Sequence, residues 1–172
     1  MKRILMYIVL ILLAFMLQNN FFATVTWINI TPNLILIITF IFGFIRGRVD
    51  GMLIGFFGGL LTDFFFGTSV GYYALIYLFI GYFNGVLGSI FYDDYLNTPI
   101  LLCIANDLVF SLYVFVTSFL LNGVTNFGYY LIKIILPEIV YTSVITLIVY
   151  RPLQGFNKWI EKIEKRSAKK FV

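Results

Sequence analysis

Long apolar segments separated by short polar turns take up most of this chain, and they constrain its fold more than any other feature. They cover residues 4–23, 32–45, 51–66, 70–91, 99–121 and 129–150. A helix needs about 20 apolar residues to cross a bilayer, with about 17 as the lower limit. Only 12% of the 172 residues are charged, far below the roughly 25% of a soluble domain. We therefore predict an all-α integral membrane protein, folded as a compact bundle of six transmembrane helices.

The second and third segments, residues 32–45 and 51–66, are shorter than a full crossing requires. They could be short or tilted helices, helices extended into their flanks, or a partly re-entrant pair. The basic residues favour two short crossings, because cytoplasmic loops of membrane proteins are enriched in Lys and Arg. Six crossings with the amino terminus inside leave only Lys133, of the twelve basic residues, outside or within the membrane. We predict that both termini are cytoplasmic.

The turn between these two segments carries Arg46, Arg48 and Asp50. We interpret it as an orientation signal in which Asp50 forms a surface ion pair with one arginine, worth about 0–1 kcal/mol. The alternative is a dock for a cytoplasmic partner. Near the amino terminus, Gln18 stands in the polar break after the first apolar run, where a signal peptide would carry small residues for cleavage. The first segment is therefore predicted to stay as an anchor.

The chain is predicted to divide into a six-helix transmembrane domain, residues 1–150, and a basic amphipathic cytoplasmic tail, residues 151–172. In the tail, apolar residues recur at helical spacing and basic residues occupy other faces. The apolar set is Leu153, Phe156, Trp159, Ile160 and Ile163. We expect this helix to lie along the inner leaflet, where each basic residue gains about 1 kcal/mol against anionic lipid. Contact with a cytoskeletal partner is the alternative.

The stretch from residue 51 to residue 71 is rich in glycine. It holds Gly51, Gly55, Gly58, Gly59, Gly67 and Gly71. Residues 51, 55 and 59 are four apart, so on a helix they form one smooth stripe that lets a second helix approach closely. The same spacing recurs at Gly43 and Gly47, and in the fourth segment at Gly81 and Gly85. We interpret the stripe as internal helix packing; the alternative is a groove for a partner's transmembrane helix.

Several polar residues lie inside the apolar segments, where an ionisable group is costly unless it is paired, hydrated or functional. They include Asp63, Asn84, Asp107, Lys133 and Glu138. Asp63 lies near the outer end of its segment, where it can cap the turn into the next helix through amides near Thr68 and Ser69, or serve a function. Lys133 enters the membrane at a similar depth, so an ion pair between Asp63 and Lys133 is a further hypothesis.

Asn84 and Asn106 match Asp107 in depth, so both are candidates to hydrogen-bond its carboxylate and to hold two helices together. Glu138 follows Pro137, which has no amide hydrogen to donate to the carbonyl of the residue four positions earlier. A kink or a polar pocket is expected at this point.

We find no motif for catalysis or cofactor binding in the chain. It has no histidine, no serine in a nucleophile elbow and no Walker glycine loop. Asp63 and Asp107 are predicted to lie in opposite halves of the membrane, which is poor geometry for a pair that shares a proton. Cys103 is the only cysteine, and burial as a small apolar residue is its simplest role. We predict a protein that is not an enzyme and has no cofactor, no metal and no nucleic-acid partner.

The run Gly55-Phe-Phe-Gly-Gly-Leu-Leu-Thr-Asp63, followed by Gly67 and Gly71, closely resembles the most recognisable segment of the rod shape-determining protein MreD family. The basic amino terminus, the break at Gln18, Pro32 at the start of the second segment and the basic tail add to the resemblance. It implies a non-enzymatic scaffold subunit of the bacterial cell-wall elongation (rod) complex, in the cytoplasmic membrane. Its implied partners are MreC within the membrane, the MreB filament, and RodA with its transpeptidase in lateral peptidoglycan synthesis. The resemblance assigns no catalytic residue.

The same family is thought to be similar to the substrate-binding subunits of energy-coupling factor transporters, which are six-helix bundles. A vitamin-binding subunit of such a transporter is therefore the alternative function. Those subunits carry an Ala-x-x-x-Ala pattern in the first helix, whereas Ala14 here has Leu10 and Gln18 at the matching positions. A closed polar pocket around Lys133 and Glu138 would favour this alternative.

Overall fold

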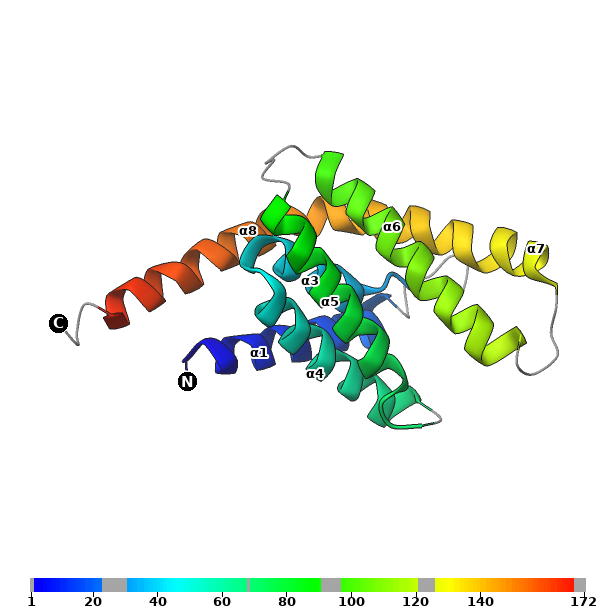
Figure 1. Cartoon of the computed structure of the whole chain (residues 1–172), viewed down its shortest axis with the longest axis horizontal. Coiled ribbons are helices and arrows are strands. Elements are labelled where there is room, and N and C mark those ends of the chain that lie inside the picture. Colours follow the sequence, from blue (N-terminus) through cyan, green and yellow to red (C-terminus); the bar gives the residue numbers. More distant parts are fainter. Residues whose placement is uncertain (1, 23–30, 68, 91–96, 121–125, 169–172) are drawn as a thin grey trace.

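The computed structural model describes residues 2–22, 31–67, 69–90, 97–120 and 126–168, and this part of the chain is helical apart from short turns (Figure 1). The first helix, α1 (Lys2–Met16), continues into the π-helical turn η1 (Leu17–Phe22). It is followed by α3 (Leu34–Arg46), α4 (Arg48–Phe66) and α5 (Tyr72–Ile90). The second half contains α6 (Asn97–Val114), η2 (Phe115–Leu120), α7 (Phe127–Tyr130), η3 (Leu131–Ile135) and α8 (Leu136–Ala168).

The prediction of an all-α, multi-pass membrane protein is confirmed. In the described residues, five helical segments are long and apolar enough to cross a membrane: 3–21, 48–66, 72–90, 98–117 and 127–165. The third apolar segment reaches this length because α4 begins at Arg48 and runs for 19 residues, so it extends into its polar flank. The sixth predicted crossing, α3, has only 13 residues, which corresponds to about 20 Å.

The short helix α3 lies at the centre of the bundle. Every residue from Leu34 to Gly43 is buried, and α3 contacts α1, α4, α5, α6 and α8. A helix that is apolar all round is stable only where other elements cover it. The longer helices of the bundle therefore surround α3 and shield it from the lipid.

Charged groups near both ends of the chain lie at one end of the bundle. Arg3 at the start of α1 is 3.5 Å from Asp50 at the start of α4 and 3.8 Å from Glu164 near the end of α8. The predicted distribution of charge places the start of α1, the start of α4 and the end of α8 on one side of the membrane. The contacts among their charged groups are compatible with that prediction. That this side is the cytoplasm stays a prediction.

The predicted tail continues the last membrane helix without a break. α8 runs for 33 residues and contains Pro152. Leu153, Asn157 and Ile160 are buried, and Leu153 and Ile160 join the main hydrophobic core. The apolar face of the tail thus packs on the bundle, whereas the sequence leads us to expect it on the inner leaflet. The last four residues of the predicted tail lie outside the described part of the chain.

Candidate functional site: the glycine seam and its polar surroundings

The glycine stripe of α4 packs directly against the backbones of α3 and α5, and we call this contact the glycine seam. A Cβ atom added at Gly51 would lie 2.6 Å from Cα of Gly43 and 2.5 Å from the carbonyl oxygen of Gly81. One added at Gly55 would lie 2.6 Å from the carbonyl carbon of Tyr77. Such close approach between helices in lipid depends on small residues. The seam is therefore the main contact that holds these three helices together.

The remaining glycines of the stretch have separate roles. Gly59 contacts the backbone of Ala74 on α5, and Gly58 faces the side chain of Ile35 on α3. Gly67 ends α4, with its amide donating to the carbonyl of Asp63 at 2.9 Å. Gly71 has φ +102°, a conformation that favours glycine, in the turn that opens α5.

The seam is occupied by this chain's own helices, as the packing interpretation predicts. The outward face of α4 is instead aromatic: Phe56, Phe57, Phe64, Phe65 and Phe66 are all exposed on the isolated bundle. The alternative in which the glycine stripe itself forms a groove for a partner helix does not fit this arrangement. A partner helix that reaches α4 meets phenylalanine side chains.

Asp63 caps the amino terminus of α5. It is 3% exposed, and its carboxylate accepts hydrogen bonds from the amides of Gly71 at 2.9 Å, Tyr73 at 2.7 Å and Ala74 at 3.1 Å. These amides are free because the first turn of a helix has no intrahelical acceptors for them, and the positive end of the helix dipole favours a carboxylate. Of the amides proposed from the sequence, Ser69 is not among these donors, and Thr68 lies outside the described residues.

The hypothesis of an ion pair between Asp63 and Lys133 is wrong. Lys133 is exposed, and no ion pair joins it to Asp63, both of which belong to the described residues. The three backbone donors satisfy the carboxylate instead.

Asn84 and Asn106 hydrogen-bond each other rather than Asp107. Each amide nitrogen donates to the other amide oxygen, at 2.7 and 3.0 Å, and both residues are buried. The predicted clamp between α5 and α6 is thus present, but its expected third member is not. Successive residues on a helix point about 100° apart, so Asp107 faces away from α5 when Asn106 faces it.

Asp107 lies against α8. It is fully buried, and neither of its carboxylate oxygens has a hydrogen-bond partner. Glu138, at the start of α8, lies close enough for electrostatic repulsion between the two acids. The backbone just before Pro137 is π-helical: the amide of Leu136 donates to the carbonyl of Leu131, one residue further back than in an α-helix. This π-helical turn accommodates the proline, which cannot donate.

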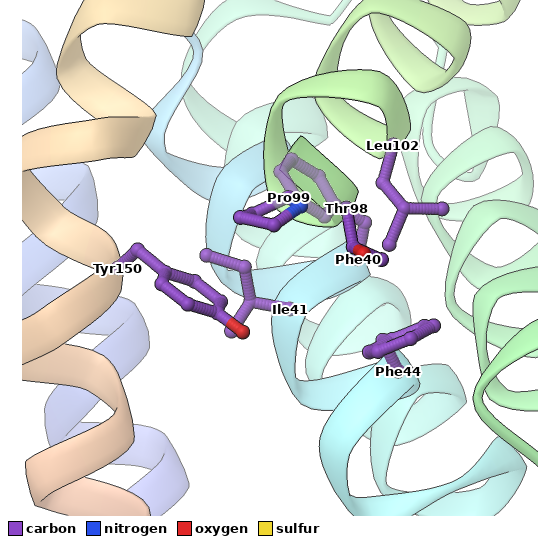
Figure 2. Close-up of a pocket in the computed structure, with 7 residues that line it drawn as sticks. All are labelled: Phe40, Ile41, Phe44, Thr98, Pro99, Leu102 and Tyr150. Carbon is purple, nitrogen blue, oxygen red and sulfur yellow. The ribbon is translucent and has the colours of Figure 1, made fainter. Parts of the chain in front are cut away.

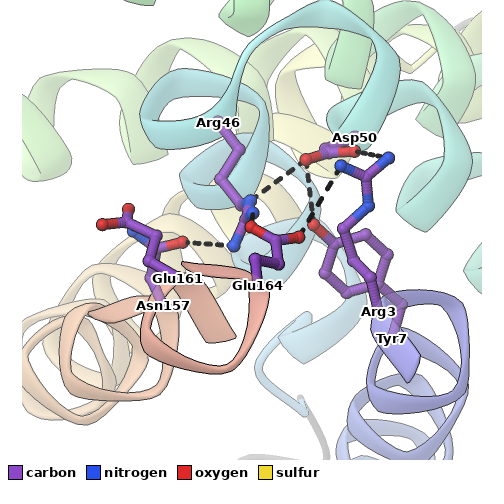
Figure 3. A network of polar contacts seen from close by, with 7 residues as sticks. All are labelled: Arg3, Tyr7, Arg46, Asp50, Asn157, Glu161 and Glu164. Atoms are coloured by element: carbon purple, nitrogen blue, oxygen red, sulfur yellow. Dashed lines mark hydrogen bonds and ion pairs between the residues drawn. The ribbon is translucent and has the colours of Figure 1, made fainter. Parts of the chain in front are cut away.

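A buried ionic network at the other end of the bundle joins four helices (Figure 3). The guanidinium of Arg46 donates to Asp50 at 3.0 Å, to Asn157 at 3.0 Å and to Glu164 at 2.6 Å. The hydroxyl of Tyr7 donates to Asp50 at 2.9 Å. The side chains of Arg46 and Asp50 are only 9% and 8% exposed. Of the two arginines predicted to pair with Asp50, Arg46 does so, and this pair is buried rather than on the surface as predicted. The network around it also fixes the tail through Asn157 and Glu164.

Comparison with protein-family models gives one decisive result. The model described as rod shape-determining protein MreD matches residues 1–160 of this chain. The chain belongs to the MreD family. The resemblance drawn from residues 51–71 is thus confirmed, and the match extends it to most of the chain. Searches of curated proteins and of solved structures found no match.

The MreD family consists of structural proteins that determine cell shape, and this chain is one of them. The glycine seam, the Asp63 cap and the Asn84–Asn106 clamp all lie inside the matched residues. In the ionic network Glu164 lies just beyond the match. The five long apolar helices fit a multi-pass membrane protein of this family.

A small apolar depression lies between α3, α6 and α8 of this MreD chain (Figure 2). It is lined by Phe40, Ile41, Phe44, Thr98, Pro99, Leu102 and Tyr150. It encloses too little space for a water molecule. The polar pocket that would favour vitamin binding is expected elsewhere, around Glu138 and Lys133, and the exposure of Lys133 does not fit a closed pocket there. The likeness to energy-coupling factor transporters stays a prediction.

Proposed function

We propose that this protein is a non-catalytic membrane subunit of the bacterial cell-wall elongation complex. In this role it binds MreC within the cytoplasmic membrane, and through MreB and the RodA-transpeptidase pair it helps to control cell shape and lateral peptidoglycan synthesis. The observation that carries the proposal is the match of the rod shape-determining MreD family to residues 1–160. No motif for catalysis competes with it in the sequence.

The surface available to a membrane partner is the outer wall of the bundle. Short loops leave little area outside the membrane, and the glycines are already used inside the glycine seam. Helices associate in lipid through side-chain packing and a few hydrogen bonds. The outward face of α4, with Phe57 at 48% and Phe64 at 70% exposed, offers an apolar ridge with exposed aromatic side chains for the single membrane helix of MreC. We assign the MreC contact to this ridge.

The outward face of the tail suits the surface of an anionic membrane. Lys158, Lys162 and Lys165 are exposed there, and Trp159 is 50% exposed. Basic side chains are attracted to anionic headgroups, and tryptophan favours the interface between hydrocarbon and water. Because the apolar face of the tail is packed on the bundle, we expect this contact to be electrostatic and to weaken as salt rises.

Crosslinking in bacterial membranes tests the proposal. A photoreactive amino acid is placed at Phe57 or Phe64. The matched control is Leu101 of α6, which at 70% is as exposed as Phe64. We expect MreC to be captured from the α4 positions and much less from Leu101. Capture from Leu101 alone would place the contact on another face. Failure to capture MreC from any outward position, or capture of a transport ATPase subunit, would refute the proposed function.

A further inference from the structure

The helices α6 and α8 face each other with polar residues in a fixed register. The Thr146 hydroxyl oxygen lies 3.3 Å from the sulfur of Cys103. The two helices are in contact, and as consecutive crossings they run antiparallel. Moving one turn along each therefore brings Asp107 opposite Thr142, and a second turn brings Ser111 opposite Glu138. Each step of four residues corresponds to about 6 Å.

The middle of this register carries a set of buried polar atoms without partners. Both carboxylate oxygens of Asp107 and the hydroxyls of Ser111 and Thr142 have no hydrogen-bond partner. The three residues are 0%, 1% and 0% exposed. The Thr142 hydroxyl lies close enough to the Asp107 carboxylate to interact with it, but the two groups do not have the geometry of a full hydrogen bond. Buried polar atoms that stay unpaired cost free energy, a charged one most of all. Three such residues converging between two membrane helices point to a ligand.

The two hydroxyls depart from the behaviour of others in this protein. Thr39, Thr62 and Thr146 each donate to the carbonyl four residues earlier in their own helix. This is the usual way in which a helix satisfies a hydroxyl where no water is available. Ser111 and Thr142 lack this bond, so their oxygens remain available to a ligand.

Among the described residues, no basic side chain forms an ion pair with Asp107. The ion pairs in this part of the chain all belong to the network around Arg46 and Asp50, and Lys133 is exposed. The titratable groups that lie close enough to feel the charge of Asp107 include Glu138 on α8, Cys103 on its own helix and Tyr77 on α5. None of these groups carries a positive charge. The charge that compensates the Asp107 carboxylate therefore comes from outside the chain.

We propose that Asp107, Ser111 and Thr142 bind one monovalent metal cation between α6 and α8. One carboxylate and two hydroxyl oxygens form a hard, all-oxygen ligand set of charge minus one, which a single positive charge neutralises. Glu138 is half-buried and lies beside these three ligands, and its carboxylate attracts the cation toward the site. The bound cation links α6 to α8, so it stabilises this half of the bundle. The proposal is independent of the contact with MreC.

The full chain, purified in lipid nanodiscs, tests this with sodium chloride against choline chloride at equal ionic strength. We expect sodium to raise the midpoint of thermal unfolding by about 5 °C or more at saturation, and radioactive sodium to bind once per chain. Asp107→Asn should abolish both effects, and Ser111→Ala and Thr142→Val should weaken binding about tenfold or more. Thr146→Val is the matched control, because that hydroxyl is satisfied by the Thr142 carbonyl at 2.8 Å; it should bind sodium normally.

The other outcomes overturn the proposal. If unfolding responds to pH but not to sodium, the compensating charge is a proton. If it responds to neither, the polar atoms are satisfied by water alone. Equal sodium binding by the parent and Asp107→Asn places the ion elsewhere. Should Asp107→Asn fail to fold, sodium binding unchanged in both Ser111→Ala and Thr142→Val would still refute the site.

Discussion

Replacing Gly55 by alanine tests the glycine seam with the smallest possible change. The added Cβ would lie 2.6 Å from the carbonyl carbon of Tyr77, whereas ordinary contacts begin at 3.4 Å. The carbonyl oxygen of Tyr77 lies closer still to the added Cβ. The helices α4 and α5 must therefore separate locally by at least about 0.8 Å, which forfeits a quarter to a half of the dispersion energy across the widened gap. Overpacking of this kind costs about 1–3 kcal/mol. We expect the upper end, because the opposing atoms are backbone and cannot rotate away.

The matched control is Gly155→Ala in α8, where no atom lies within 4 Å of the added Cβ. Both substitutions gain about 1 kcal/mol in helix propensity, so the difference between the two variants isolates the overpacking cost. Thermal unfolding of the purified protein measures it: a difference of about 3 kcal/mol corresponds to about 6–12 °C for a chain of this size. Equal midpoints for Gly55→Ala and Gly155→Ala would show that the glycine seam is not close-packed and refute the reasoning.

Substitutions in three polar features, the ionic network, the Asp63 cap and the Asn84–Asn106 clamp, are compared by equilibrium unfolding. Arg46→Ala should lower the free energy of unfolding by about 3–5 kcal/mol, because it leaves Asp50 buried without its main partner. It should also make the tail accessible to proteolysis. The control is Arg151→Ala at an exposed position, which should change the free energy of unfolding by less than about 0.5 kcal/mol. Asp63→Ala should cost about 1–2 kcal/mol as a lost helix cap, and Asp63→Asn less. Asn84→Leu alone should destabilise more than the double variant with Asn106→Leu, since the single change leaves one amide unpaired.

The local features of this chain were predictable from the sequence. The glycine spacing predicts close packing, and Asp63 lies within 8 to 11 residues of the three amides that it caps. Such short-range pairings follow from the order of helix, turn and helix. Whether this chain's own helices or a partner's helix covers the glycine stripe was not predictable. The spacing places small residues on one face of α4, but it does not say which helix packs against that face.

The ionic network shows why longer-range features were missed. Arg46 bonds to Asn157 and Glu164, which are 111 and 118 residues away in the sequence. Periodicity in the tail predicts an amphipathic helix, but a lipid surface and a protein surface cover the same apolar stripe equally well. Asn157 and Glu164 share the face of Leu153 and Ile160, and this polar interruption is the sequence signal that favours a protein surface.

The short length of α3 explains where the buried polar groups of the protein lie. Its 13 residues span about 20 Å, whereas the hydrocarbon core is about 30 Å thick. At least one end of α3 must therefore lie at a depth where no water reaches its free backbone groups, and each unpaired group there costs several kcal/mol.

At the amino end of α3, side chains meet this requirement. The amide of Leu36 donates to the side chain of Asn33 at 3.0 Å, and the amide of Ile35 donates to Gln18 at 3.3 Å. At its carboxyl end, the amide of Gly47 donates to the carbonyl of Gly43 at 2.9 Å, and the Arg46 side chain anchors this end to α4 and α8 through the ionic network. The break at Gln18 in the first apolar segment thus supplies an acceptor where α3 begins. Polar residues that appear misplaced in the apolar segments let a helix too short for the membrane form the centre of the bundle.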